Sequence, residues 1–181
     1  MLLRSSGGLD VFDPDRSKQA FSDIENAYLN SPLHVLSDVS KIKGVGLYGL
    51  YLLGEPLPYA QDYDYCSTPV YLGKAVPDGW NIGEGVAILQ SSKLYDRIMN
   101  HRTSIAQVDN LHVNDFLVRI LMLDPDWIES AETFLIRKFC PVWNVRVRGF
   151  GNKALGIERG KSKISLWDQY HPGRKRIRKH E

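Results

Sequence analysis

The sequence predicts an α+β fold in which a small, mostly antiparallel sheet of about three strands is flanked by helices. Two observations support this class. The chain has 181 residues, 43% of them hydrophobic, which is enough for one globular domain. Its periodic segments follow the order helix, two strands, helix, strand, helix, and then a basic extension. Such a mixture of short strands and helices is typical of a two-layer α+β domain.

Three segments have the composition of strands. Residues 46–53 are rich in leucine and tyrosine and end at a glycine, and residues 69–75 form a second short run. A polar loop joins them, so we expect the two strands to pair antiparallel. Residues 112–123 are rich in β-branched and bulky side chains and predict a third strand.

Three further segments have helical periodicity. Residues 16–29 and 91–105 repeat apolar side chains at helical spacing, and a serine precedes the second of them as a possible cap. The clearest helix covers residues 124–139. There Asp124 is expected at the N-cap and Pro125 at the first helical position.

The charge is distributed unevenly along the chain. Residues 137–181 carry 13 lysines and arginines against three acidic residues, so they have a net charge of +10, while the rest of the chain is at −8. This asymmetry favours a polyanionic partner, although a solvated basic tail would look the same. We divide the single domain into an N-terminal arm that carries the first predicted helix (1–40), a core (41–145) and a basic extension (146–181).

Several classes of protein are disfavoured by the sequence. No apolar run reaches the roughly 20 residues that a membrane span needs, and the first residues do not resemble a signal peptide. Cys66 and Cys140 form no disulfide framework, which favours a reduced cytoplasmic protein. The histidines have no metal-ligand spacing, and no serine-hydrolase or P-loop pattern occurs.

Two pairs of polar residues are candidates for a catalytic role. Tyr48 and Tyr71 lie on the two paired strands, and because side chains alternate along a strand, Tyr48 and Tyr51 point to opposite faces. Arg97 and His101 lie four apart on one helical face. Taken alone, the tyrosines are most simply sheet packing and the second pair an exposed polar face.

Three more residues have an equally plain structural explanation when considered alone. Glu132 lies on the last helix beside apolar residues, Asn144 follows that helix, and Lys74 adjoins a strand glycine. They could be a surface glutamate, a turn residue and a solvated lysine, or they could take part in a site.

Together these residues match a known pattern, because the sequence resembles the GIY-YIG nuclease superfamily. GLY at Gly46–Tyr48 corresponds to the first signature and YLG at Tyr71–Gly73 to the second. Both depart from the family by leucine in place of isoleucine. RIMNH supplies the arginine and histidine, and AETFLIRKFCPVWN supplies the glutamate and, twelve residues later, the asparagine.

The resemblance extends beyond the catalytic core. RGFGNKALG at 148–156 and SLWDQYHPGR at 165–174 are similar to the type II restriction endonuclease branch that recognises CCGCGG. This implies a prokaryotic, cytoplasmic homodimer that cleaves palindromic double-stranded DNA within a restriction–modification system. Two other functions stay open: a structure-specific, repair or mobile-element nuclease, and an inactive DNA-binding module on the same fold.

The resemblance also implies the site. Glu132 would bind Mg²⁺, with Mn²⁺ as a substitute, and the general base would be Tyr48, His101 or Lys74. The implied catalytic residues are Tyr48, Tyr71, Arg97, His101, Glu132 and Asn144. The implied DNA contacts are Lys74, Arg148, Lys153, Arg159 and Arg174.

Overall fold

A four-stranded antiparallel sheet lies at the centre of the computed structural model, which describes residues 2–4, 10–12, 15–65, 67–80, 90–151 and 164–174. The strand order is β3-β6-β4-β5. The strands are β3 (Leu33–Val35), β4 (Gly46–Leu52), β5 (Tyr71–Ala75) and β6 (Phe116–Met122). The α+β class and the antiparallel pairing of the first two predicted strands are confirmed.

The sheet has one strand more than predicted. The additional strand, β3, pairs antiparallel with β6. It has only three residues and all three are exposed, so it lacks the alternation that would have marked it in the sequence. The predicted strand at 112–123 also begins later than expected, because residues 113–115 form a 3₁₀ turn, η4 (Val113–Asp115), ahead of β6. A separate short hairpin joins β1 (Leu2–Arg4) and β2 (Asp10–Phe12).

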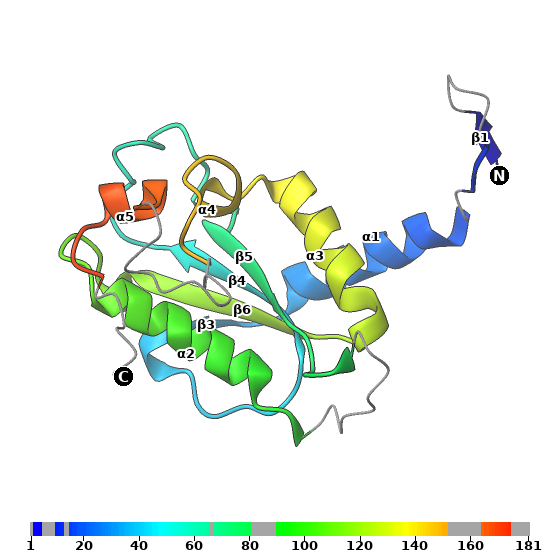
Figure 1. The fold of residues 1–181 in the computed structure, drawn as a ribbon, viewed down its shortest axis with the longest axis horizontal. Coiled ribbons are helices and arrows are strands. Elements are labelled where there is room, and N and C mark those ends of the chain that lie inside the picture. The colour runs from blue at the N-terminus through cyan, green and yellow to red at the C-terminus, as the bar shows by residue number, and fades with distance from the viewer. Residues whose placement is uncertain are drawn as a thin grey trace.

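One face of the sheet is covered by α2 (Lys93–Ala106). Figure 1 shows this helix extending along one side of the sheet. Leu94, Ile98 and Ile105 of α2 are buried and share a hydrophobic cluster with Tyr48 and Leu50 of β4. The helix was predicted at 91–105. Ser92 is its N-cap residue but makes no side-chain capping bond, while the Ser91 hydroxyl accepts the Lys93 backbone N–H at 3.3 Å.

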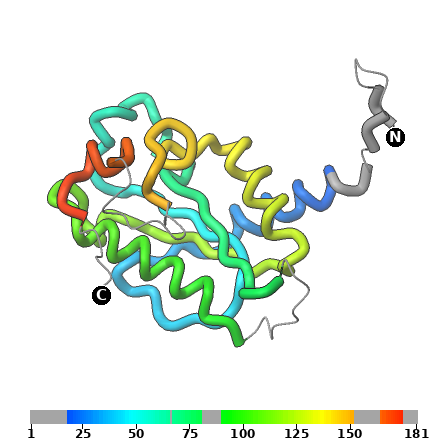
Figure 2. Tube along the Cα trace, in the orientation of Figure 1, coloured from blue at the N-terminus to red at the C-terminus, as the bar shows by residue number. Residues whose placement is uncertain are grey.

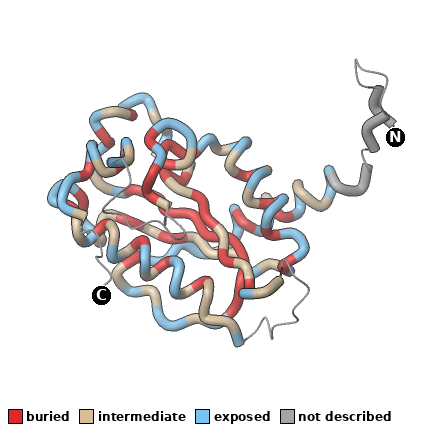
Figure 3. Tube along the Cα trace, in the orientation of Figure 1, coloured by how far each residue is buried: buried red, intermediate tan, exposed pale blue. Residues whose placement is uncertain are grey.

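The opposite face is covered by α1 (Asp15–Asn30) and α3 (Pro125–Phe139). Tyr28 of α1 and Leu135 of α3 are fully buried in a second cluster with Leu47 of β4. The predicted cap of α3 is confirmed, because the Asp124 carboxylate accepts the Asp126 backbone N–H at 3.0 Å. The layers are therefore helix, sheet and helices, and all seven residues of β4 are buried between them (Figure 3).

Two short helices follow α3, where the sequence predicted no regular structure. They are α4 (Val142–Val145) and α5 (Leu166–Tyr170), with four and five residues. Helices this short show no readable periodicity. Tertiary contacts hold them instead: Trp143 and Trp167 are buried and meet edge to face, with ring centroids 5.6 Å apart. None of the helices among the described residues is long and apolar enough to cross a membrane.

Candidate active site

Tyr48 and Tyr71 lie on the face of the sheet that α2 covers. In the antiparallel register of β4 and β5, Tyr48 pairs with Gly73 and Leu50 pairs with Tyr71. Residues opposite each other share a face, so the two tyrosines are diagonal neighbours with ring centroids 6.3 Å apart. Tyr51 lies on the other face, where its hydroxyl donates to that of Tyr28 at 3.2 Å. The structure therefore separates Tyr48 from Tyr51 as the alternation predicted.

The glycine of the second signature makes room for the tyrosine of the first. A Cβ atom at Gly73 would lie 2.6 Å from the Tyr48 hydroxyl oxygen and 2.9 Å from the Tyr71 ring. Any larger residue would push both rings out of place. Glycine within a strand often marks the close approach of another group, and here that group is the Tyr48 side chain.

His101 of α2 completes this cluster. Its side chain is almost fully buried, and its Nε2 lies 2.8 Å from the Tyr48 hydroxyl oxygen. Its ring centroid is 4.8 Å from that of Tyr71. Arg97, one turn earlier on the same helix, is exposed. The predicted helical face thus carries one buried and one exposed polar residue, and the buried one is bonded to the first signature tyrosine.

Burial keeps both tyrosines protonated in the free protein. Desolvation raises the pKa of Tyr48 well above its usual value, and the neighbouring Tyr71 raises it further. Desolvation, with a smaller contribution from the Glu132 charge, raises the pKa of Tyr71 to about 12. The positive charge of Arg97 opposes the shift at both residues. Both side chains are therefore neutral phenols at neutral pH.

Glu132 reaches the same region from α3. Its side chain is only 19% exposed, and its Oε2 lies 3.1 Å from the Lys74 ammonium. Lys74 also pairs with the more exposed Glu129 at 3.2 Å. Burial raises the pKa of Glu132, while Lys74 and Arg97 oppose this shift. The carboxylate thus lies in a partly desolvated position flanked by two cations, and Lys74 is ion-paired rather than simply solvated.

Asn144 of α4 fixes the edge of the sheet behind the tyrosines. Its side-chain oxygen accepts the Leu72 backbone N–H, and its amide N–H donates to the Leu72 carbonyl, each at 2.8 Å. Leu72 lies between Tyr71 and Gly73 on β5, which is the edge strand. Asn144 therefore makes the backbone hydrogen bonds that a further strand would make with the free edge of β5, and it makes them within the second signature.

A comparison with protein families finds a match over most of this chain. A family model described as the Eco29kI GIY-YIG domain matches residues 40–181. The chain belongs to the Eco29kI GIY-YIG family. No match is found among the curated proteins. The predicted membership of the GIY-YIG restriction endonucleases is confirmed, and with it a nuclease that acts on DNA.

The predicted DNA contacts fall into three groups in this family member. Arg148 is exposed just after α4. The side chain of Arg174 is buried, with only 5% of it exposed, and Lys74 is held by the two glutamates described above. Lys153 and Arg159 lie outside the described residues.

The described residues contain no group of three or more histidines, cysteines, aspartates and glutamates that could hold an ion. Glu132 has one carboxylate near it, that of Glu129, which pairs with the same lysine. Mg²⁺ favours oxygen ligands and commonly keeps several waters, so it needs only one or two protein carboxylates when a substrate phosphate supplies further oxygens. The donor set of this site therefore fits Mg²⁺ and does not fit a zinc site, which requires three or four protein ligands.

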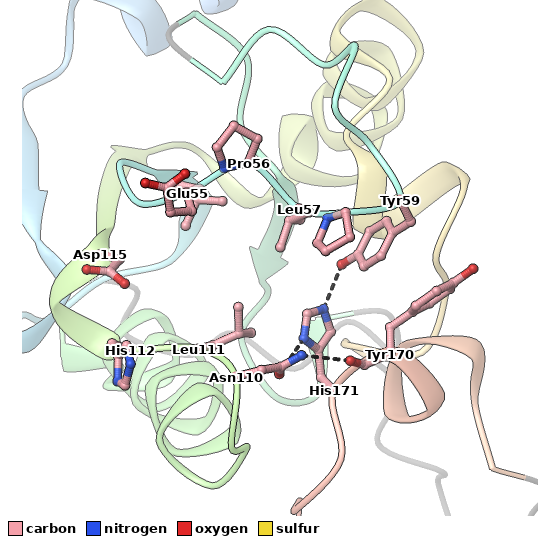
Figure 4. Close-up of a pocket in the computed structure, with 12 residues that line it drawn as sticks. Glu55, Pro56, Leu57, Tyr59, Asn110, Leu111, His112, Asp115, Tyr170 and His171 are labelled. Carbon is pink, nitrogen blue, oxygen red and sulfur yellow. Dashed lines mark hydrogen bonds between the residues drawn. The ribbon is translucent and has the colours of Figure 1, made fainter.

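A second hydrogen-bonded group, which does not include Tyr48 or Tyr71, lies beside a cavity of about 400 Å³ (Figure 4). His171, which is fully buried, lies 2.6 Å from the Tyr59 hydroxyl and 2.9 Å from the Asn110 side-chain oxygen. Burial, with a smaller contribution from the Arg174 charge, lowers the pKa of His171 to about 4. Sequence reasoning assigned no role to His171, although it lies within the SLWDQYHPGR segment that supported the resemblance.

Proposed function

We propose that this nuclease is a Mg²⁺-dependent type II restriction endonuclease of a prokaryotic restriction–modification system. It would hydrolyse phosphodiester bonds in double-stranded palindromic DNA, with CCGCGG as its target. Membership of the Eco29kI GIY-YIG family supports this proposal, together with the similarity of residues 148–156 and 165–174 to that branch.

The observation that carries the proposal is the contact between Tyr48 and His101. A buried phenol whose pKa is raised cannot deprotonate water by itself at neutral pH. A histidine nitrogen 2.8 Å away can take the phenolic proton as it leaves, because the usual pKa of imidazole lies near neutrality. The pair can therefore act as one general base, in which Tyr48 would contact the water and His101 would accept the proton.

In this mechanism a water oxygen attacks the phosphorus atom and the phosphodiester bond to the leaving oxygen breaks. As the water loses a proton to the Tyr48 oxygen, the Tyr48 proton moves to His101 Nε2. The leaving oxygen takes a proton from solvent, and His101 returns its proton to solvent after the reaction. Tyr71 would hold the water or a phosphate oxygen by a hydrogen bond.

The charges around the pair suit a phosphate substrate. Arg97 presents a planar fork of donors that suits phosphate oxygens, and its exposure leaves it accessible to DNA. Glu132 would hold Mg²⁺, or Mn²⁺ in its place. Bound there, the ion would polarise the phosphoryl oxygen and stabilise charge on the leaving oxygen.

One such site cuts one strand, so a palindrome is most simply cleaved by a two-fold dimer with one subunit on each half-site. The basic extension would hold the phosphates, since contacts to phosphates from lysine and arginine dominate DNA affinity. Of the contacts predicted in the described part of this extension, Arg148 is exposed and is therefore accessible to DNA.

Plasmid cleavage tests the proposal. The purified chain is incubated with Mg²⁺ and a plasmid that carries two CCGCGG sites, beside a plasmid with neither site, and EDTA serves as the control. Discrete fragments from the first plasmid alone, with ends that map to the two sites, are expected. A smear, or cleavage only of branched DNA, would favour a repair nuclease. Binding without any cleavage would favour an inactive module.

A further inference from the structure

The turn at residues 149–151 lies directly against the catalytic cluster. Phe150 is almost fully buried, and its ring stacks on that of His101 with centroids 4.6 Å apart and an interplanar angle of 24°. The same ring meets Tyr71 edge-on at 5.0 Å. One side chain of this turn therefore contacts two of the residues to which the proposed mechanism gives a role.

The turn also approaches Tyr71 through its backbone. A Cβ atom at Gly151 would lie 2.1 Å from the Tyr71 hydroxyl oxygen, so only glycine fits there. A shift of the turn by even 1 Å would change the surroundings of both His101 and Tyr71. The position of this turn is consequently part of the geometry of the site.

Arg174 holds the turn in place. Its guanidinium donates to the carbonyl of Phe150 at 3.1 Å and to that of Gly149 at 3.2 Å. The same group pairs with the Asp168 carboxylate at 2.6 Å and lies over the Trp167 ring, 4.6 Å from its centroid. In Figure 2, residues 164–174, which include α5, lie beside the part of the chain that follows α4.

The helix that anchors Arg174 is itself attached to the turn. The Trp167 backbone N–H of α5 donates to the Arg148 carbonyl at 3.1 Å, and the Trp167 ring packs on Phe150 with centroids 4.9 Å apart. At the far end of α5, His171 is bonded to Tyr59, whose hydroxyl accepts the Trp143 indole N–H at 2.8 Å. The turn, α4 and α5 thus form one connected unit behind His101.

We propose that Arg174 is a positioning residue for His101 and not a DNA contact. Its fork of donors satisfies two adjacent carbonyls and one carboxylate at once, and this fixes the turn that presses Phe150 onto the imidazole. A lysine would keep the charge but could not make these contacts together. The inference rests on the proposed function, in which His101 takes the Tyr48 proton.

The burial of Arg174 separates this role from phosphate binding. A side chain that is 5% exposed cannot reach DNA unless the turn opens. Arg148, which belongs to the same turn region and is exposed, offers a matched control. Removing a phosphate contact raises the dissociation constant for DNA and reduces the salt dependence of binding. A positioning residue lowers the rate of the chemical step on bound DNA instead.

The test compares R174M, R174K and R148M with the wild type in the full chain. The dissociation constant for a CCGCGG duplex is measured in EDTA, and the single-turnover cleavage rate is measured at saturating duplex with Mg²⁺. We expect R174M and R174K to keep the dissociation constant within about twofold and to lose about 10- to 100-fold in rate, the cost of a small misplacement of reacting groups. R148M is expected to weaken binding.

A third measurement does not depend on cleavage. The imidazole ¹⁵N resonances of His101, recorded on the free protein and assigned with His101→Gln, should shift in R174M and stay in place in R148M. If R174M does not fold, F150L takes its place, because it keeps Arg174 and removes only the stacked ring. It should show the same loss of rate with the same DNA affinity.

The outcomes separate the two proposals. A wild type that cleaves, with an R174M variant that binds DNA more weakly and cuts at an unchanged rate, would make Arg174 a DNA contact and overturn the inference alone. Wild-type rates in R174K together with a slow R174M would show that the charge suffices, which also overturns it. A wild type that never cleaves would refute the proposed function, and the His101 resonances would still report whether Arg174 positions the ring.

Discussion

Replacing Tyr48 by phenylalanine is the sharpest test of the proposed base, because β4 supplies its own control. Tyr48 and Tyr51 are on the same strand, both are nearly fully buried, and each hydroxyl is hydrogen-bonded to another side chain. Tyr48 faces His101, while Tyr51 faces Tyr28 on the other side of the sheet. The variants Y48F and Y51F therefore remove the same atom from the same strand, and only one of them touches the proposed site.

The expected effects on stability and on rate differ in size. Loss of one buried hydrogen bond costs about 1 kcal/mol of the free energy of unfolding, and each variant should lose about this much. Removing a positioned general base costs about 10²- to 10⁴-fold in rate, which Y48F should show at saturating DNA. Y51F should retain the rate to within about twofold, because its hydroxyl lies away from the reacting atoms.

The assay is single-turnover cleavage of a duplex at saturating enzyme, with urea unfolding of the same preparations monitored by tryptophan fluorescence. Y48F should be slow and Y51F fast at nearly equal stability. If Y51F were the slow variant, the first signature would be in the wrong register. If both variants cut at the wild-type rate, no tyrosine hydroxyl of β4 would act in the reaction, and the pairing of Tyr48 with His101 would have no catalytic role.

Three further predictions concern the carboxylate, the edge strand and the buried histidine. The cleavage rate of E132Q should be lower by about 10³-fold or more, while DNA binding is kept or tightened because a negative charge near the phosphate is removed. E129Q is the control, and equal cleavage rates for the two variants would contradict the assignment. N144A should lower the free energy of unfolding by about 1–3 kcal/mol in a urea titration, because the backbone N–H and carbonyl of Leu72 lose their partners; no change would mean that water replaces the amide. The lowered pKa of His171 means that the unfolded chain binds a proton more readily than the folded chain. The free energy of unfolding should therefore fall as the pH drops from about 6.5 toward 4, by about 2 kcal/mol at pH 5. H171Q should flatten this part of the pH profile of urea unfolding, and an unchanged profile would exclude His171 as its source.

The elements that sequence reasoning located well are those with strong local signals. Helix α3 has an aspartate cap, a proline at its first position and a regular apolar stripe, and the structure starts and ends it as predicted. Strand β4 was predicted almost to the residue. The strands and helices that were missed are short, with between three and five residues, which is too few for periodicity to appear. They are β1, β2, β3, α4 and α5.

The candidate site was identified as a set of residue types in a fixed order, and their arrangement came from the fold. The sequence could place Arg97 and His101 on one helical face, but it could not show that only His101 is buried. It offered Arg174 as a candidate DNA contact on the basis of the charge of the C-terminal segment, and it could not show which groups the guanidinium contacts within the protein. The contacts of Arg174 are with carbonyls and a carboxylate near it in space, and no local pattern encodes them.

The amino-acid order alone therefore determined the α+β class, the family, the main helices and strands, and the residue types available for chemistry. Propensity, capping and alternation act between neighbours along the chain, so they can be seen in the sequence. Only the tertiary structure decided which tyrosine hydroxyl meets the histidine, which cations are buried, and that Lys74 pairs with Glu132. These outcomes depend on strand register and on desolvation by segments far apart along the chain, and both arise only when the sheet and its helices pack together.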